Sequence, residues 1–158
     1  ALLAGRDVTV THMKDLTYTS QVIKESLRLY PPGWAVMRQA AIDTELGGYK
    51  ISKGSYVFVS PYVMHHHPDY WHKPEVFDPE RFGPDAEDVD RCVYFPFLRG
   101  QRQCIGDRFA EMELTLLLVT LVQRYRFTLV PDHPVELEPS VTLRPKHGML
   151  MTLTSRSA

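Results

Sequence analysis

Phe97-Leu98-Arg99-Gly100-Gln101-Arg102-Gln103-Cys104-Ile105-Gly106 is the most distinctive stretch of this 158-residue sequence, and it leads directly into a long apolar segment. Cys104 lies just ahead of the expected helix. The positive end of the helix dipole there favours a negatively charged sulfur, the form of cysteine that ligates metals. Gly100 suits a tight left-handed turn, and Gly106 lets the backbone approach a flat ligand without a Cβ in between. The stretch therefore predicts a loop that presents a thiolate to a bound group.

Two further side chains of this loop suit the same purpose. Arg102 places a guanidinium where it can pair with a carboxylate, and Phe97 offers a ring that can shield the sulfur from water. A lone cysteine before a helix is otherwise usually a small buried hydrophobe. The pattern Phe-x-x-Gly-x-Arg-x-Cys-x-Gly resembles the haem-binding loop of cytochrome P450 enzymes, and every fixed position is filled. The resemblance implies that Cys104 is the axial ligand of a haem iron, with backbone N–H groups around Ile105 and Gly106 tempering its charge.

An amphipathic helix is expected from about Tyr18 to Leu29. Ile23, Leu27 and Tyr30 fall on one apolar stripe at helical spacing. The helix should stop at Pro31-Pro32, which pushes the residue before it out of helical geometry.

Glu25 and Arg28 share one face of this helix. Alone, such a pair is usually exposed and contributes little to stability. However, residues 25–32 resemble the Glu-x-x-Arg helix of the cytochrome P450 family and its exit, and Pro79-Glu80-Arg81-Phe82 resembles the family's Pro-Glu-Arg-Phe segment. The resemblance implies a buried structural network of Glu25, Arg28 and Arg81 that locks the haem side of the core.

Residues 33–37 read as an apolar strand that ends in Arg38. The resemblance implies that this segment passes over the distal face of the haem, and that Arg38 and Arg102 hold haem propionates. It also implies that a later turn, residues 140–143, lines the substrate pocket. The pocket candidates are Trp34, Val36, Met37 and Val141. Plain core packing is an equally good explanation of Trp34 and Met37.

Short strands and one further helix complete the pattern. Gly47-Gly48 separates Thr44–Leu46 from Tyr49–Ile51, which is typical of a hairpin, and Tyr56–Val59 suits a buried strand. Residues 108–124 are apolar nearly all round, which predicts a helix buried inside a larger body. The expected fold class is mainly α with small β-sheets (α+β), and the resemblance implies the C-terminal part of the cytochrome P450 fold.

Four histidines, at positions 65, 66, 67 and 72, suggest a metal site. Adjacent side chains on an extended chain point to opposite faces, so three consecutive histidines make a poor single-metal site. His65-His66-His67-Pro68 instead resembles the structural His-Arg-Asp-Pro-like segment of the family, with departures at His66 and His67.

Composition excludes several classes of protein. The net charge is −1, so nothing suggests a nucleic-acid partner. Two cysteines are too few for a disulfide framework, which favours a reducing compartment. The resemblance of the motifs favours a soluble, bacterial-like cytoplasmic protein. A Cys92–Cys104 bridge stays open, but it would remove the expected ligand. The longest apolar run, Leu114 to Val122, falls short of the ~20 residues of a membrane span, so no membrane segment is expected here, whereas an upstream anchor remains open.

The resemblance covers residues 1–158 but only the C-terminal part of the family's fold. We therefore expect a fragment of a single domain, without its N-terminal part and distal oxygen-activating helix, that is inactive alone. The implied function is a haem-thiolate monooxygenase with haem b, which inserts one atom of O2 into a hydrophobic organic substrate. Its electrons would come from a ferredoxin or a flavodoxin-like donor or reductase, steered by Arg99 and Arg108 near Gln101. The alternatives are a haem-thiolate isomerase, dehydratase or peroxygenase, and a non-catalytic remnant or interaction module.

Overall fold

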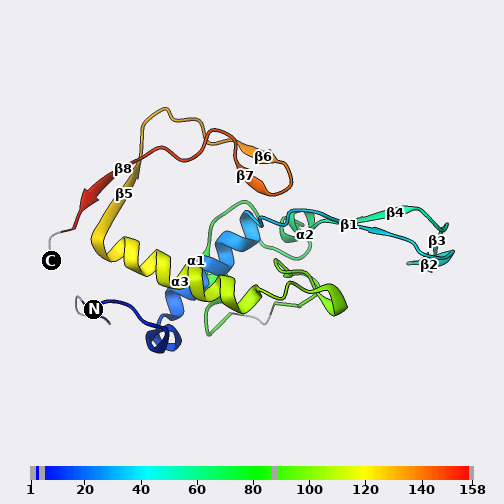
Figure 1. Ribbon diagram of the computed structural model, residues 1–158, viewed down its shortest axis with the longest axis horizontal. Coiled ribbons are helices and arrows are strands. Elements are labelled where there is room, and N and C mark those ends of the chain that lie inside the picture. Colours follow the sequence, from blue (N-terminus) through cyan, green and yellow to red (C-terminus); the bar gives the residue numbers. More distant parts are fainter. Residues whose placement is uncertain (1–2, 4–5, 87–88, 157–158) are drawn as a thin grey trace.

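Helices and small antiparallel sheets alternate along the chain, which confirms the predicted fold class (Figure 1). The structure is a computed structural model that describes residues 3, 6–86 and 89–156. Its helical elements are η1 (Val10–Asp15), α1 (Thr17–Leu29), α2 (Pro61–His65), η2 (Pro79–Phe82), η3 (Gly100–Arg102) and α3 (Asp107–Arg124). Its strands are β1 (Val36–Gln39), β2 (Thr44–Leu46), β3 (Tyr49–Ile51), β4 (Tyr56–Val59), β5 (Tyr125–Leu129), β6 (Leu137–Pro139), β7 (Leu143–Pro145) and β8 (Met151–Ser155).

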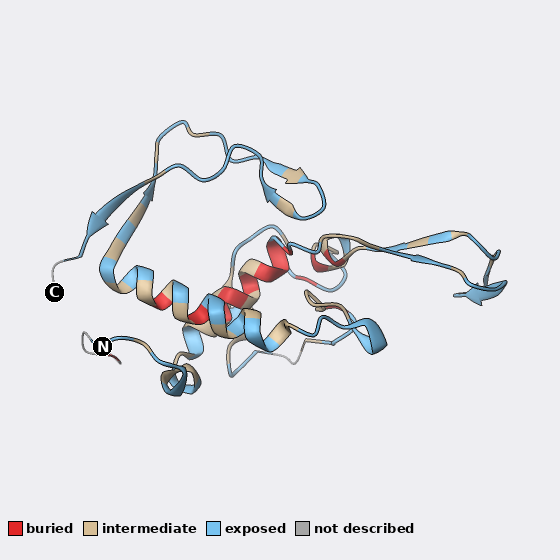
Figure 2. Ribbon diagram, in the orientation of Figure 1, coloured by how far each residue is buried: buried red, intermediate tan, exposed pale blue. Residues whose placement is uncertain are grey.

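The core lies around α1, which contacts α2, α3 and η2. Figure 2 shows that the buried residues concentrate on α1 and next to it. Ile23, Leu27 and Leu29 are buried as the helical stripe predicts. Tyr30 is exposed, because the helix ends at Leu29 and the backbone of Tyr30 turns out of helical geometry, with φ −132° and ψ 58°. The two prolines therefore end the helix as expected, but Tyr30 does not join the stripe.

Helix α3 follows the cysteine-containing loop, as predicted, and packs on α1. Among its residues only Thr115 and Val119 are buried in the described part of the chain. Its other faces carry exposed apolar side chains, among them Phe109, Leu117 and Leu121. No described helix has both the length and the apolar character needed to cross a membrane.

The described residues also form four two-stranded antiparallel sheets. Strand β1 pairs with β4 in the register Val36↔Val59, and β2 pairs with β3 through the predicted Gly47-Gly48 hairpin. The two remaining sheets pair β5 with β8 and β6 with β7. The prediction that Tyr56–Val59 is buried is wrong: the strand is largely exposed. The reason is visible in Figure 1, where β1 and β4 form a thin ribbon that projects away from the helices.

Candidate functional site

The loop that carries Cys104 closes on itself ahead of α3. It turns at Gly100, whose φ of +76° is the left-handed conformation expected from the sequence. The backbone N–H of Cys104 then donates to the carbonyl oxygen of Phe97 over 2.9 Å. Since α3 begins at Asp107, this turn fixes Cys104 just before the helix, and its thiol is exposed and free. Cys92 is also a free thiol.

An apolar cavity of about 380 Å³ opens beside this thiol. It is lined by α1, by the segment after α1, by the cysteine loop and by α3, with contributions from Leu27, Val36, Phe97, Leu98, Cys104 and Leu114. Its size falls within the range of small-molecule sites. On the loop itself Ile105 is fully exposed, and a Cβ built on Gly106 would meet only the Cys104 sulfur, at 3.8 Å. The sulfur thus faces open, apolar surroundings that suit a flat hydrophobic ligand.

Of the four predicted pocket residues, only Val36 lines this cavity. Trp34 is instead tied to the β6–β7 hairpin, because its indole Nε1 donates to the carbonyl oxygen of Ser140 over 2.8 Å. Met37 and Val141 are exposed.

The two arginines expected to hold carboxylates are exposed. Arg38 lines a neighbouring cavity of about 330 Å³ together with Arg91 and Arg99. Its guanidinium donates to the carbonyl oxygen of Met37 over 2.9 Å. The guanidinium of Arg102 makes no hydrogen bond or ion pair with any residue that the structure describes. Both cationic groups are therefore available to anionic groups of a ligand.

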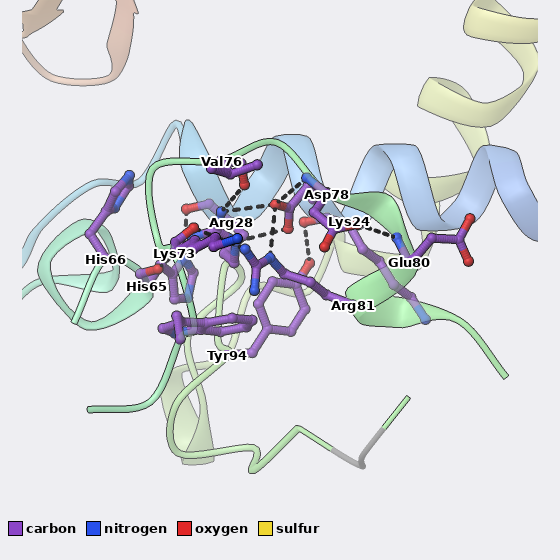
Figure 3. Close-up of polar contacts among 12 residues, drawn as sticks. Lys24, Arg28, His65, His66, Lys73, Val76, Asp78, Glu80, Arg81 and Tyr94 are labelled. Atoms are coloured by element: carbon purple, nitrogen blue, oxygen red, sulfur yellow. Dashed lines mark hydrogen bonds and ion pairs between the residues drawn. The ribbon is translucent and has the colours of Figure 1, made fainter. Parts of the chain in front are cut away.

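The structure brings the predicted Glu25–Arg28 pair together in full burial. Figure 3 shows Arg28 among its polar contacts, between His65, Val76 and Asp78. Nε and Nη2 of Arg28 donate to the two oxygens of the Glu25 carboxylate, each over 2.8 Å, and both side chains are 0% exposed. The backbone N–H of Asp78 also donates to Glu25, over 2.9 Å. The remaining donors of Arg28 reach the carbonyl oxygens of His65 and Val76, over 2.8 and 3.2 Å. This network links α1 to α2 and to the segment before η2.

Arg81 approaches the same carboxylate but binds it less closely. Its Nε lies 3.4 Å from Oε1 of Glu25, an ion-pair distance without hydrogen-bond geometry. Its Nη2 donates to the carbonyl oxygen of Lys73 over 2.9 Å. Arg81 thus complements the charge of Glu25 and anchors the turn at Lys73.

His65 is a buried member of this region that sequence reasoning treated only as part of a structural segment. Its Nδ1 lies 3.2 Å from the carbonyl oxygen of Arg28, and its Nε2 accepts the backbone N–H of Phe95 over 3.1 Å. Burial lowers the pKa of His65 from 6.5 to about 4, and the positive charge of Arg28 acts in the same direction. The imidazole is therefore neutral near neutral pH. The resemblance to a His-Arg-Asp-Pro-like segment set His65 apart from its two neighbours, which depart from that pattern, but only the fold shows that its ring faces the core.

Aromatic rings surround His65. Tyr94 lies 5.3 Å from it and Trp71 6.5 Å, measured between ring centroids, and Arg28 stacks over Trp71 at 5.1 Å. The hydroxyl of Tyr94 donates to the carbonyl oxygen of Lys24 over 3.1 Å. Burial raises the pKa of Tyr94 well above its ordinary value, so this hydroxyl keeps its proton. The cluster packs α1 against the segment that leads into the cysteine loop.

Three comparisons place the chain among known proteins. A family model described as Cytochrome P450 matches residues 1–152. The chain is 44% identical over 131 residues to the cyclooctat-9-en-7-ol 5-monooxygenase of Streptomyces melanosporofaciens, and 37% identical over 144 residues to the thromboxane-A synthase of Macaca fascicularis. These matches cover 82% and 89% of the chain but 28% and 27% of the relatives. The solved structure of a retinoic acid-bound cyanobacterial CYP120A1 matches 96% of the chain and 35% of its own length, with 34% identity and a TM-score of 0.88.

Proposed function

This chain belongs to the cytochrome P450 family, and from that premise we propose that the protein acts as a haem-thiolate monooxygenase on a hydrophobic organic substrate. The observation that carries the proposal is the free thiol of Cys104 in the wall of an apolar cavity, immediately ahead of α3. The chain spans about a third of the length of the relatives it matches, at 28% and 35% for two of them. The activity of the whole protein is therefore part of the proposal.

Proteins of this family bind haem, and the residues around Cys104 fit such a group. In our proposal the Cys104 sulfur would ligate the haem iron, and the open surface at Ile105 and Gly106 would admit a flat ring. Arg102 and Arg38 are free to hold its propionates by charge-assisted hydrogen bonds. Phe97 and Leu98 line the cavity and would shield the sulfur from water once a ring is bound. When bound, a thiolate-ligated haem supplies the activation of O2 that oxygenation needs.

This chain's own contribution is to position and protect the sulfur. The hydrogen bond from the N–H of Cys104 to the carbonyl oxygen of Phe97 closes the loop. The buried Glu25–Arg28 pair holds α1, whose Leu27 lines the same cavity. The apolar lining lowers the local dielectric, which strengthens the interactions of a charged sulfur with nearby N–H groups. We further propose that residues 1–158 alone hold haem weakly and do not turn over substrate, because exposed apolar faces such as that of α3 leave the site open to water.

The haem-thiolate alternatives differ in the fate of oxygen. An isomerase or dehydratase leaves no atom from O2 in its product, and a peroxygenase takes the atom from peroxide. One of the relatives is named a monooxygenase, which supports oxygen insertion as the first reaction to test. Turnover of the full-length protein under isotopically labelled O2, with a chemical or protein electron donor, should place one labelled atom in the product. A product without label would contradict the monooxygenase proposal, and an absence of haem would favour the non-catalytic interaction module.

The electron donor is proposed to dock near the cysteine loop. Arg99 and Arg108 are exposed on either side of Cys104, and their positive charge suits an acidic ferredoxin or a flavodoxin-like protein. For cellular location the proposal is cytoplasmic, supported by a bacterial relative.

A further inference from the structure

We propose that His65 is a positioning residue for the cysteine loop, through which the backbone of α1 holds the backbone at Phe95 in place. This inference rests on the proposed haem-thiolate function. Among the described residues, His65 has the one buried imidazole. Its ring nitrogens face backbone groups of Arg28 and Phe95, and not the side chains of the Glu25–Arg28 ion pair.

The hydrogen bonds of His65 define its tautomer. A backbone N–H can only donate, so Nε2, which faces the N–H of Phe95 at 3.1 Å, must be without a proton. Nδ1 then carries the proton and donates it to the carbonyl oxygen of Arg28 over 3.2 Å. Both partners are backbone groups, which makes the imidazole a spacer of fixed length between α1 and residue 95. In a protonated ring Nε2 would carry a hydrogen that faces the N–H of Phe95, and two donors cannot form a hydrogen bond. Only the neutral imidazole can therefore bridge the carbonyl oxygen of Arg28 and the N–H of Phe95.

The bridge ends close to the sulfur. From Phe95 the backbone turns at once, since the N–H of Leu98 donates to the carbonyl oxygen of Phe95 over 2.9 Å. The carbonyl oxygen of Phe97 then accepts the N–H of Cys104, also over 2.9 Å. Leu98 itself is held at a φ of +60°, a conformation that costs a non-glycine residue free energy and persists only when its surroundings enforce it. Holding Phe95 is thus part of what holds the strained turn, and through it Cys104.

Packing supports the same role. The His65 ring lies 5.5 Å from the Phe95 ring and 5.3 Å from the Tyr94 ring, between centroids. A phenylalanine at position 65 would retain these ring contacts but would leave the N–H of Phe95 facing an apolar ring. A glutamine retains one donor and one acceptor on a flexible side chain. Comparison of the two replacements therefore distinguishes the effect of losing the hydrogen bonds of His65 from the effect of losing its ring contacts.

The test uses the full-length, haem-loaded protein in three variants: His65→Phe, His65→Gln and, as control, His72→Phe at an exposed histidine of the same segment. During a guanidinium titration, thiolate ligation is followed by the red-shifted Soret band of the reduced CO complex, and global folding by far-UV circular dichroism. We expect His65→Phe to shift the equilibrium away from thiolate ligation by about tenfold, as one unsatisfied buried amide does. In His65→Phe the Soret band should be lost at a clearly lower guanidinium concentration than the circular dichroism signal of the fold. His65→Gln should restore part of the lost ligation, and His72→Phe should behave like the unmodified protein.

Several results would overturn the inference. One such result concerns the guanidinium midpoints for loss of the Soret band and for loss of the fold. If these two midpoints differ in His65→Phe by no more than they do in the unmodified protein, His65 is only a packing residue. If His65→Phe does not fold, the comparison of His65→Gln with His65→Asn replaces it, because the shorter asparagine side chain cannot reach both backbone partners. Equal thiolate ligation in His65→Gln and His65→Asn would then contradict the bridge. An unmodified protein without the red-shifted band would overturn the proposed function, and this inference with it.

Discussion

Arg28 and His65 hold each other twice: the Arg28 guanidinium donates to the backbone carbonyl of His65, and the His65 imidazole donates to the backbone carbonyl of Arg28. The two bonds, of 2.8 and 3.2 Å, join α1 to the end of α2 with both side chains fully buried. Because Arg28 also binds Glu25 and His65 also binds Phe95, the ion-pair network and the approach to the cysteine loop form one connected unit.

Removal of the Arg28 guanidinium should be strongly destabilising. Arg28→Met leaves the buried carboxylate of Glu25 without its cation, and we expect a loss of about 3–5 kcal/mol in the free energy of unfolding. Arg144→Met is the matched control, because Arg144 pairs with Glu138 on the surface, where such pairs contribute about 1 kcal/mol or less. Urea denaturation of both variants measures the difference, and similar losses would show that the buried network is not the stabilising element.

A side chain at Gly100 should lower stability for reasons of backbone conformation alone. The φ of Gly100 is +76°, and no atom lies within 4 Å of a Cβ built on it. Gly100→Ala should therefore cost about 1–2 kcal/mol of unfolding free energy without any steric clash. Gly33→Ala, at a glycine that also has open space but lacks a positive φ, should be near neutral. A neutral Gly100→Ala variant would mean that the turn relaxes to another conformation.

Acid should weaken the fold through His65. Burial, reinforced by the positive charge of Arg28, holds its pKa at about 4, below the ordinary 6.5. Between these two values the unfolded chain binds more protons than the folded one, so the free energy of unfolding falls as the pH falls through this window, by about 3 kcal/mol at most. Above the window this contribution is complete.

Urea midpoints at about pH 7 and about pH 5 measure the upper part of this effect, because pH 7 lies above the window and pH 5 lies within it. His65→Phe should show a smaller decrease between the two pH values than the unmodified protein. Equal decreases would show that His65 titrates alike in the folded and unfolded chain.

Charge reversal near the cysteine loop should slow reduction by an acidic electron donor. Arg99→Glu places a negative charge beside the proposed docking surface, so we expect a reduction rate lower by about tenfold at low ionic strength and a weaker dependence on salt. Arg126→Glu is the control, since Arg126 is exposed at the opposite end of α3. Stopped-flow reduction that is insensitive to both Arg99→Glu and ionic strength would exclude steering by this surface.

The sequence predicted those features that depend on local chemistry. The left-handed turn at Gly100, the Gly47-Gly48 hairpin and the end of α1 before two prolines each follow from the conformational limits of one or two residues. The Glu25–Arg28 pair shares a helix face by spacing, although its burial was implied only by family resemblance.

What the sequence could not predict depends on long-range packing. The resemblance marked His65, among three adjacent histidines, as part of a structural segment, but only the assembled fold shows that its ring faces the core and meets Phe95, which lies 30 residues away in sequence. The same holds for the Tyr56–Val59 strand: its β-branched and aromatic residues suit burial, but burial requires a covering layer that the described residues do not provide. Trp34 likewise meets Ser140, 106 residues away, and not the cavity.

The central claim is that the Cys104 sulfur ligates a haem iron, and the reduced, CO-treated full-length protein tests it most directly. The unmodified protein should show the red-shifted Soret band of thiolate ligation. Cys104→Ser should lose that band, while Cys92→Ser, at the other free and exposed thiol, should keep it. A red-shifted band that survives in Cys104→Ser, or that is absent from the unmodified protein when haem is bound, would contradict the account.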